Sequence, residues 1–275
     1  MTNSRKQKRN QSLVYNKLHN SDSRKKINWG DSSHLFGPRN LFRNKLIVNN
    51  ITNVLKRGAV LDFGCGNGNL IEMLSALGYT CTGVEPSKSS IVYLNHRFGN
   101  NNKIKIVHGT QNFLFTTNKR FDIVTAGEVL EHIKDDDHVV SGMFRLLKPN
   151  GHCIVTVPAH QQRWSNSDVA AGHFRRYSLQ NLVKLFEDVG FTVLRVYYWG
   201  FPLGRLWDRL LMRPNIENEL KSNAIATSSN SRVVGLLSLL TPVLSSVFRV
   251  DMMFNFTHQG NGLLLVGQKP NSKSK

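Results

Sequence analysis

A glycine-rich turn, residues 64–68, is the part of the sequence best suited to hold a ligand. An apolar stretch beginning at Val60 precedes it, and Leu70, Leu74 and Leu77 follow it at helical spacing, so the pattern predicts a strand, a turn and a helix. Glycines in such a turn permit positive φ, and the N-terminus of the helix offers free N–H groups. A ligand is therefore expected to lie across this turn.

The spacing of these glycines differs from that of a dinucleotide site. The turn reads GxGxG and lacks the third glycine, two places further on, that the dinucleotide fingerprint requires. An acid, Asp62, also stands inside the end of the preceding strand. A glycine-rich turn can serve a dinucleotide, but these two details favour another ligand.

Four further segments follow the turn in a fixed order. TGVEPS ends a second strand, FDIVTAGEVLEHI gives a fourth strand with a loop and helix, LLKPNGHCIVTVP gives a turn and fifth strand, and GLLLVGQK gives a last strand. With them the sequence resembles the class I S-adenosylmethionine (SAM)-dependent methyltransferases over about residues 58–199 and 262–268. The EVLEH run is typical of the subgroup related to ubiquinone and menaquinone biosynthesis methyltransferases.

The resemblance implies both a fold and a reaction. The fold is an α/β, Rossmann-like sheet of seven strands in the order 3-2-1-4-5-7-6, with strand seven antiparallel and helices on both faces. The reaction is transfer of a methyl group from SAM to a small-molecule or lipid-like acceptor. Two rival functions remain open: a methyltransferase acting on RNA or another nucleic acid, and a non-catalytic protein that binds SAM as a partner subunit.

The resemblance also implies the cofactor-binding residues. Glu85 stands 21 residues after Gly64, where the family has an acid that accepts hydrogen bonds from both ribose hydroxyls. Relatives often carry an acid near the adenine amino group, but this chain reads HGTQNF there, which leaves Thr110 and Gln111 as candidates. The full set expected to contact SAM is Asp62, Gly64, Cys65, Gly66, Glu85, Pro86, Thr110, Gln111, Gly127 and Glu128.

His132 is the best candidate for a catalytic base, because an imidazole can take up a proton near neutral pH. Glu128 precedes it by four residues, so the two are expected to share one face of a helical turn. Local packing is an equally good interpretation of this histidine. Three adjacent acids, residues 135–137, are expected to cap the next helix rather than to bind a metal, and no metal site is predicted.

Residues 159–177 form an unusually polar and aromatic segment between the fifth strand and the next helix. Loops after the carboxyl ends of parallel strands hold the ligands of open α/β sheets, so this segment is predicted to be the acceptor wall. His173 is a second catalytic candidate. Some of the polar residues must only fasten the loop, and the acceptor-binding candidates are His160, Arg163, Trp164, Arg175, Arg176 and Tyr177.

Composition and charge limit the remaining functions. The chain has 275 residues and a net charge of +18, but residues 1–26 carry eight Lys and Arg against one Asp, whereas residues 58–199 carry fourteen against twelve acids. This distribution argues against a nucleic acid as the partner, since its phosphates would need a basic surface beside the active site. Three scattered cysteines indicate neither a disulfide framework nor a zinc site, and no signal peptide or membrane span is visible, so a cytoplasmic protein is expected.

About 60 residues separate the sixth strand, residues 192–199, from the last strand. The divisions expected are a basic arm (1–38), a SAM-binding core (39–199) that begins with a helix over 40–56, a helical insertion or lid (200–260), the final strand (261–269) and a tail (270–275). In the insertion, five apolar residues, Leu203, Leu206, Trp207, Leu210 and Leu211, are predicted to form one face of a helix, with Arg205, Arg209 and Arg213 on another. The apolar run 233–250 is too short to span a bilayer. Insertion and arm together predict a peripheral protein on the anionic inner face of a membrane, the alternative being that the apolar segments complete the core or form a dimer contact.

Overall fold

The computed structural model describes residues 37–212 and 241–271. Within them a single seven-stranded sheet has the order β3-β2-β1-β4-β5-β7-β6. Strand β7 is antiparallel to both of its neighbours, and the other pairs are parallel. The strands are β1 (Ala59–Phe63), β2 (Thr80–Glu85), β3 (Ile104–His108), β4 (Phe121–Gly127), β5 (Leu147–Pro158), β6 (Thr192–Trp199) and β7 (Gly262–Gln268). The strand order and the antiparallel last strand predicted from the sequence are confirmed.

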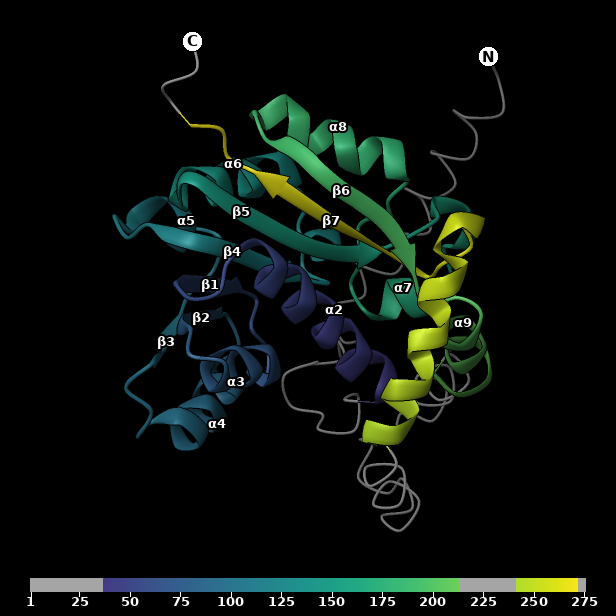
Figure 1. Cartoon of the computed structure of the whole chain (residues 1–275), viewed down its shortest axis with the longest axis horizontal. Helices are drawn as coiled ribbons and strands as arrows, with labels where there is room; N and C mark the ends of the chain where they lie inside the picture. The colour runs from purple at the N-terminus through teal and green to yellow at the C-terminus, as the bar shows by residue number, and fades with distance from the viewer. Residues whose placement is uncertain (1–36, 213–240, 272–275) are drawn as a thin grey trace, which may run out of the picture.

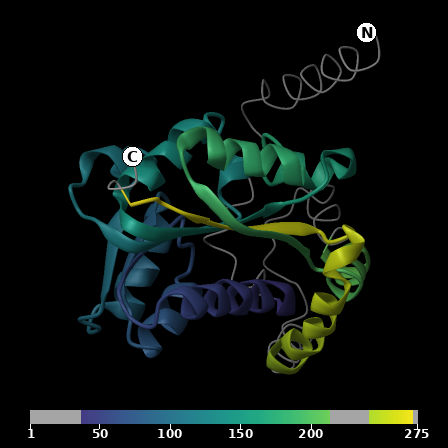
Figure 2. The ribbon, with the colours of Figure 1, turned by 45° about the horizontal axis from the view of Figure 1, so that its top comes forward.

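Helices cover both faces of the sheet, which gives three layers (Figures 1 and 2). On one face lie α2 (Pro38–Val54), α3 (Asn69–Ala76) and α4 (Lys88–Phe98). On the other lie α5 (Phe113–Thr116), α6 (Asp136–Leu146) and α8 (Leu179–Val189). Shorter turns, η2 (Leu130–His132), η3 (Gln161–Arg163) and α7 (Asn166–Ala170), lie in the connections after β4 and β5.

The sheet separates two hydrophobic cores. Successive residues of a strand point to opposite faces, so Ile123 packs with α2 and α3 while Val124 packs with α6 and α8. Strands buried on both faces read as continuous apolar runs, which is why the parallel strands were recognisable in the sequence. This burial fixes the register of the sheet and therefore the place where each strand ends.

The helix ends also follow from the sequence. Ser178 accepts a hydrogen bond from the Asn181 N–H at the start of α8, and Gly190 closes that helix with φ of 105°. Gly78, at φ of 94°, follows α3 in the same way. Helix α2 begins at Pro38, two residues before its predicted start, because a proline is well placed in a first turn.

The insertion after β6 contains α9 (Leu203–Trp207), a π-helical turn η4 (Asp208–Met212), a helix over 241–247 and η5 (Phe248–Thr257). Leu203 and Trp207 pack against the core, whereas Leu206 and Leu210 are exposed, so the predicted apolar face is buried only in part. The α-helix is five residues long and continues into the π-helical turn. Arg213, residues 214–240 and the basic arm before Gly37 lie outside the described residues. No helix in the described ranges is long and apolar enough to cross a membrane.

Candidate active site

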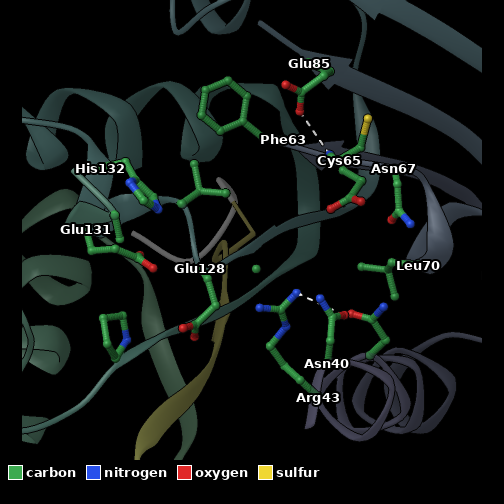
Figure 3. A pocket seen from close by; sticks show the side chains of 18 of the residues that line it. Asn40, Arg43, Phe63, Cys65, Asn67, Leu70, Glu85, Glu128, Glu131 and His132 are labelled. Carbon is green, nitrogen blue, oxygen red and sulfur yellow. Dashed lines mark hydrogen bonds between the residues drawn. The ribbon is translucent and has the colours of Figure 1, made fainter. Parts of the chain in front are cut away.

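A cavity of about 1120 Å³ opens at the carboxyl ends of β1, β2 and β4. The glycine turn and the residues after β2 and β3 form one end of it, and η2, α7 and the residues after α7 form the other. The first turns of α2 and the end of α9 close the side, as Figure 3 shows for Asn40 and Arg43 of α2. One cavity therefore joins the two regions that the sequence assigned to a cofactor and to an acceptor.

The glycine turn is fixed by backbone hydrogen bonds and by close packing. Gly64, Gly66 and Gly68 all have positive φ, at 75°, 55° and 80°. The N–H groups of Gly64 and Cys65 donate to the carbonyl of Val84, which ties the turn to β2. A Cβ at position 64 would approach Val129 Cγ2 to 2.6 Å, whereas a Cβ at position 66 would meet nothing within 4 Å. Gly66 therefore keeps open the space in which a ligand can approach the backbone.

Glu85, at the end of β2, is anchored on the same turn. Its Oε2 accepts a hydrogen bond from the Gly66 N–H (Figure 3), and its Oε1 accepts one from the Ser87 N–H, both at 3.0 Å. Burial raises the pKa of this carboxyl group, and the two hydrogen bonds oppose that rise. The carboxylate is thus held rigidly and keeps lone pairs free to accept two hydroxyl donors, as a ribose would provide.

Charged groups meet in the middle of the cavity. Asp62 accepts a hydrogen bond from Thr125 Oγ1 at 2.7 Å, and its burial raises the pKa to about 6. Arg43 reaches in from α2, and burial lowers its pKa although Glu128 faces it. Glu128 has φ of 60° and precedes η2, so the expectation that it shares a helical face with His132 is wrong. The left-handed backbone turns Glu128 into the cavity, where its Oε1 is buried without a partner among the described residues.

The far end of the cavity contains two histidines. The rings of His132 and His173 are 4.6 Å apart and meet edge to face. Burial, with a smaller contribution from His173, lowers the pKa of His132 to about 4. Glu131 is fully buried beside them, and neither of its carboxylate oxygens has a hydrogen-bond partner in the described part of the chain.

Glu131, His132 and His173 also form a cluster that could hold a metal ion. One ligand atom from each lies within 4.8 Å of the others. Two imidazoles and a carboxylate suit zinc, manganese or iron better than magnesium. The acids 135–137, in contrast, lie at the start of α6, where Asp135 makes no capping hydrogen bond and Asp136 accepts one from the Tyr177 hydroxyl at 2.7 Å. Capping by Asp135 is therefore a wrong prediction, while Asp136 and Asp137 lie in the first turn, where they complement the helix dipole.

Asp168 organises the segment 159–177. It is 1% exposed and accepts hydrogen bonds from His173 Nδ1 at 3.0 Å and Arg176 Nε at 2.7 Å. Its other oxygen accepts from the backbone N–H and the hydroxyl of Ser165. Burial opposes ionisation, but the hydrogen bond from His173 and the charge of Arg176 outweigh it and lower the pKa to about 2. With Nδ1 engaged, Nε2 is the remaining nitrogen with which His173 can act in the cavity.

Five of the six predicted acceptor-binding residues lie outside the lining of the cavity. His160 stacks on Tyr198, and Arg163 donates to the Gln259 carbonyl and side chain. Arg175 donates to the Lys134 carbonyl and pairs with Asp136, and Tyr177 is buried. Trp164 is absent from the lining as well. The structure brings only Arg176 of this set to the cavity, because fastening a long loop uses most of its polar side chains.

All ten predicted cofactor-binding residues and both predicted catalytic histidines line the cavity. Sequence reasoning expected the helix over 40–56 and the insertion to cover the cavity but named no individual lining residue on α2, on η2 or in the insertion. For α2 a signal existed, since polar residues recur at helical spacing in its first turns. The polar and aromatic lining residues not named in advance on these elements include Arg39, Asn40, Arg43, Asn44, Glu131, Trp207 and Asp208.

Three comparisons with known proteins agree with this geometry. The chain is 39% identical over 121 residues to a ubiquinone biosynthesis O-methyltransferase of Coxiella burnetii; the match covers 43% of this chain and 49% of that protein. It thus spans about half the length of the curated relatives it matches. Phosphoethanolamine N-methyltransferase 2 of Haemonchus contortus, solved with SAM, superimposes with a TM-score of 0.60 at 18% identity over 94% of this chain and 60% of that one. The [4+2]-cyclase SpnF superimposes with a TM-score of 0.56 at 18% identity, covering 83% and 81% of the two chains.

The structural neighbours are too distant in sequence to show more than a fold, and one of them is a cyclase. The decisive match is to a family model described as a methyltransferase domain, which covers residues 39–196 and so more than half of the chain. Those residues include the glycine turn, Glu85 and both cavity histidines. The chain therefore belongs to the methyltransferase domain family and has its class I fold, for which SAM is the methyl donor.

Proposed function

We propose that this protein transfers the methyl group of SAM to a hydroxyl oxygen of a small-molecule acceptor. One observation carries the proposal: the same cavity is lined at one end by a glycine turn with an anchored acid, and at the other end by two histidines and an ion-paired arginine. The curated relative compared above is named a ubiquinone biosynthesis O-methyltransferase, which favours an oxygen acceptor on a small molecule.

The cofactor end of the cavity fits SAM in its shape, in its hydrogen-bonding groups and in its charges. Glu85 would accept from the ribose hydroxyls, and Gly66 leaves the space above the turn free. Arg43 and Glu128, which face each other with buried polar atoms unpartnered in the described chain, match the carboxylate and ammonium groups of a methionine part. When bound, SAM supplies a methyl group on a cationic sulfur that leaves as a neutral thioether.

The protein then has two tasks, to hold the acceptor in line and to remove its proton. Positioning alone can contribute about 7–11 kcal/mol. His173 is held by Asp168 through Nδ1, so its Nε2 is the atom that would take the hydroxyl proton. His132 lies against the same ring and would orient the acceptor oxygen. Arg176, paired with Asp168, offers its remaining N–H groups to a polar acceptor.

The cluster of Glu131, His132 and His173 supplies an alternative way to activate the hydroxyl, by a bound divalent cation. Assays with EDTA, followed by return of Zn²⁺ or Mn²⁺, separate the two. Turnover unchanged by the chelator supports the histidine base, and loss restored by the metal assigns the activation to the cation.

The test of the whole proposal is a pair of glycine variants. Gly66 and Gly78 both have positive φ and open space around a Cβ, but only Gly66 lines the cavity. Gly66→Val should reduce SAM affinity in calorimetry at least a hundredfold, whereas Gly78→Val imposes similar backbone strain and should leave affinity within about threefold. Mass spectrometry of extracts incubated with methyl-labelled SAM then identifies the acceptor. Wild-type protein that binds neither SAM nor its demethylated product contradicts the assignment.

We also propose that the insertion is a lid and that the protein works at the cytoplasmic, anionic face of a membrane. Trp207 and Asp208 line the cavity, and Trp207 lies 3.7 Å from the position a Cβ would take on Gly37, before α2. A nucleic-acid acceptor is less favoured, because the cavity lining contains six acids against three arginines and one lysine, whereas phosphates need a basic surface. Salt-sensitive RNA binding by the purified protein would revive that alternative.

A further inference from the structure

One continuous apolar stripe runs along the outer side of the segment 241–257. Val243, Val247 and Val250 recur at α-helical spacing, and Met253 and Phe256 continue at the three-residue spacing of η5. All five are exposed, and Met253 and Phe256 are the most exposed, at 72% and 77%. The change from α to 3-10 geometry keeps the stripe on one side, which no single helical period in the sequence would reveal.

The inner side of the same segment makes the contacts that attach it to the core. Ser245 accepts a hydrogen bond from Lys45 of α2, and Phe248 packs edge to face on Phe42. Asp251 is 1% exposed and accepts the N–H groups of Leu203 and Gly204, which fixes the start of α9. The outer stripe is therefore not needed to attach this segment to the core.

The exposed charges next to the stripe are positive. Arg249 lies within the stripe segment and Arg209 lies on η4, and both are exposed. Leu206 and Leu210, on α9 and η4, add exposed apolar area at 53% and 61%. The acid of the stripe segment, Asp251, points inward and is buried.

We propose that this surface, the stripe together with Leu206, Leu210, Arg209 and Arg249, docks on an anionic lipid bilayer. Apolar side chains flanked by arginines match an interface in which acyl chains lie beneath anionic headgroups. A soluble protein partner would need a complementary acidic rim, and a second copy would oppose arginine to arginine. The same short segment that exposes Leu206 turns Trp207 and Asp208 into the cavity, so docking would set the cavity wall against the membrane.

This inference deepens the proposed function by naming where the acceptor is found: an apolar acceptor in the membrane would reach the cavity past α9. It rests on that proposal only for the acceptor. Vesicle binding and SAM binding are separate measurements on the same protein, so the failure of one leaves the other interpretable.

The experiment is co-sedimentation of the full chain with vesicles of phosphatidylcholine alone or of equimolar phosphatidylcholine and phosphatidylglycerol. Met253→Ser with Phe256→Ser should weaken partitioning by about tenfold or more, because two inserted side chains are lost. Arg209→Gln and Arg249→Gln should each weaken binding to the anionic vesicles by about fivefold, the equivalent of about 1 kcal/mol per basic residue, and leave binding to neutral vesicles unchanged.

Two matched controls test the location of the surface. Val92 is 72% exposed, as Met253 is, and its helix α4 lies on the opposite side of the molecule from the segment 241–257 (Figure 1). Arg120, directly before β4, is exposed as Arg209 and Arg249 are. Val92→Ser and Arg120→Gln should leave partitioning unchanged. SAM affinity measured on every variant verifies that the fold is intact.

Three results would overturn the inference. The first is absence of wild-type binding to anionic vesicles at low salt. The second is binding that falls with salt but not in the stripe variants, which assigns it to the basic residues 1–26. The third is a wild-type dimer that the stripe variants convert to a monomer without any change in vesicle binding, which makes the surface a contact between copies.

Discussion

The two ends of the cavity are held in place by different groups, mainly backbone groups at one end and side chains at the other. At the Gly64 end, backbone groups hold the geometry: the N–H groups of Gly64 and Cys65 donate to the Val84 carbonyl, and the Glu85 carboxylate is itself anchored by two backbone N–H groups. At the His173 end, the wall is a connection after β5 that is held by side-chain pairs centred on Asp168.

The difference has a physical consequence. The geometry of the Gly64 end is set by strand register and by positions that need positive φ. Those positions tolerate few substitutions, but the geometry does not depend on many different side chains. A side-chain-built end depends on buried ion pairs, whose loss leaves an uncompensated charge. Substitutions at the Gly64 end should therefore lower ligand affinity, whereas substitutions at the His173 end should lower turnover and local stability.

Removal of Asp168 should produce the largest effect. Asp168→Ala leaves His173 and Arg176 without their buried partner, and we expect unfolding free energy to fall by about 3–5 kcal/mol. Turnover should fall at least a thousandfold, while SAM affinity stays within about threefold because the other end is held by backbone.

The matched control is Asp188→Ala, which removes an exposed pair with Lys184 and should cost at most about 0.5 kcal/mol. Denaturant unfolding, single-turnover methyl transfer and calorimetry measure the three quantities. Loss of SAM affinity in folded Asp168→Ala protein would remove the distinction between the two ends.

The next largest effect is expected at Asp62, where substitution measures the free-energy cost of burying a charge at the cofactor end. Its folded pKa of about 6 is raised above the ordinary value of 3.8, so the folded state holds a proton that the unfolded chain has released. Its contribution to stability is therefore present in full below about pH 4 and is lost as pH rises through about 6. Asp62→Asn should be more stable than wild type at pH 7 by roughly 2–3 kcal/mol, with no difference below pH 4.

Asp122→Asn is the control of opposite sign. Burial raises the pKa of Asp122, but the hydrogen bonds from Lys148 and the Ala59 N–H, together with the charge of Lys148, outweigh it and lower the pKa, so this variant should lose stability above pH 4 and match wild type in acid. Unfolding curves recorded from pH 3 to pH 8 give both signs. Equal pH dependence of the two variants would show that burial of Asp62 is not what raises its pKa.

A smaller effect is expected at Gly64, where steric contact can be separated from backbone strain. Gly64→Ala places a Cβ 2.6 Å from Val129 Cγ2 at φ of 75°, and SAM affinity should fall by more than tenfold. Val129→Ala alone should leave affinity within about twofold. In the double variant the contact is relieved but strain of about 1–2 kcal/mol remains, so affinity should recover only in part. Full recovery would mean that the left-handed backbone is not required at this turn.

The same difference between the ends explains what sequence could predict. The glycine turn, the strands and the place of Glu85 at a strand end follow from glycine spacing and apolar runs, whereas the strand order is what the family resemblance implies, and each is confirmed in the structure. The loop 159–177 gave a correct location for His173 and Arg176 but not for Arg163 or Tyr177, since a polar residue that fastens a loop has the same sequence signal as one that binds a ligand. Arg43 and Trp207 reach the cavity from segments before β1 and after β6, and only the tertiary packing brings them there.

The smallest effect is expected at Arg163. Its substitution separates residues that only hold the loop 159–177 in place from residues that bind the acceptor. Its guanidinium donates to the Gln259 carbonyl at 3.1 Å and to the Gln259 side chain at 2.8 Å, and it lies outside the cavity lining. Arg176 stands in the same loop but lines the cavity and pairs with the buried Asp168.

Arg163→Ala should therefore change kcat and KM for the acceptor by less than about threefold, because an exposed contact contributes about 0.2–1 kcal/mol. Arg176→Lys keeps the charge but loses the planar donor geometry, and it should raise the acceptor KM more than Arg163→Ala does. If Arg163→Ala instead raises the acceptor KM tenfold while loop stability is unchanged, the acceptor extends past the described cavity towards β7, and Arg163 is a binding residue as the sequence predicted.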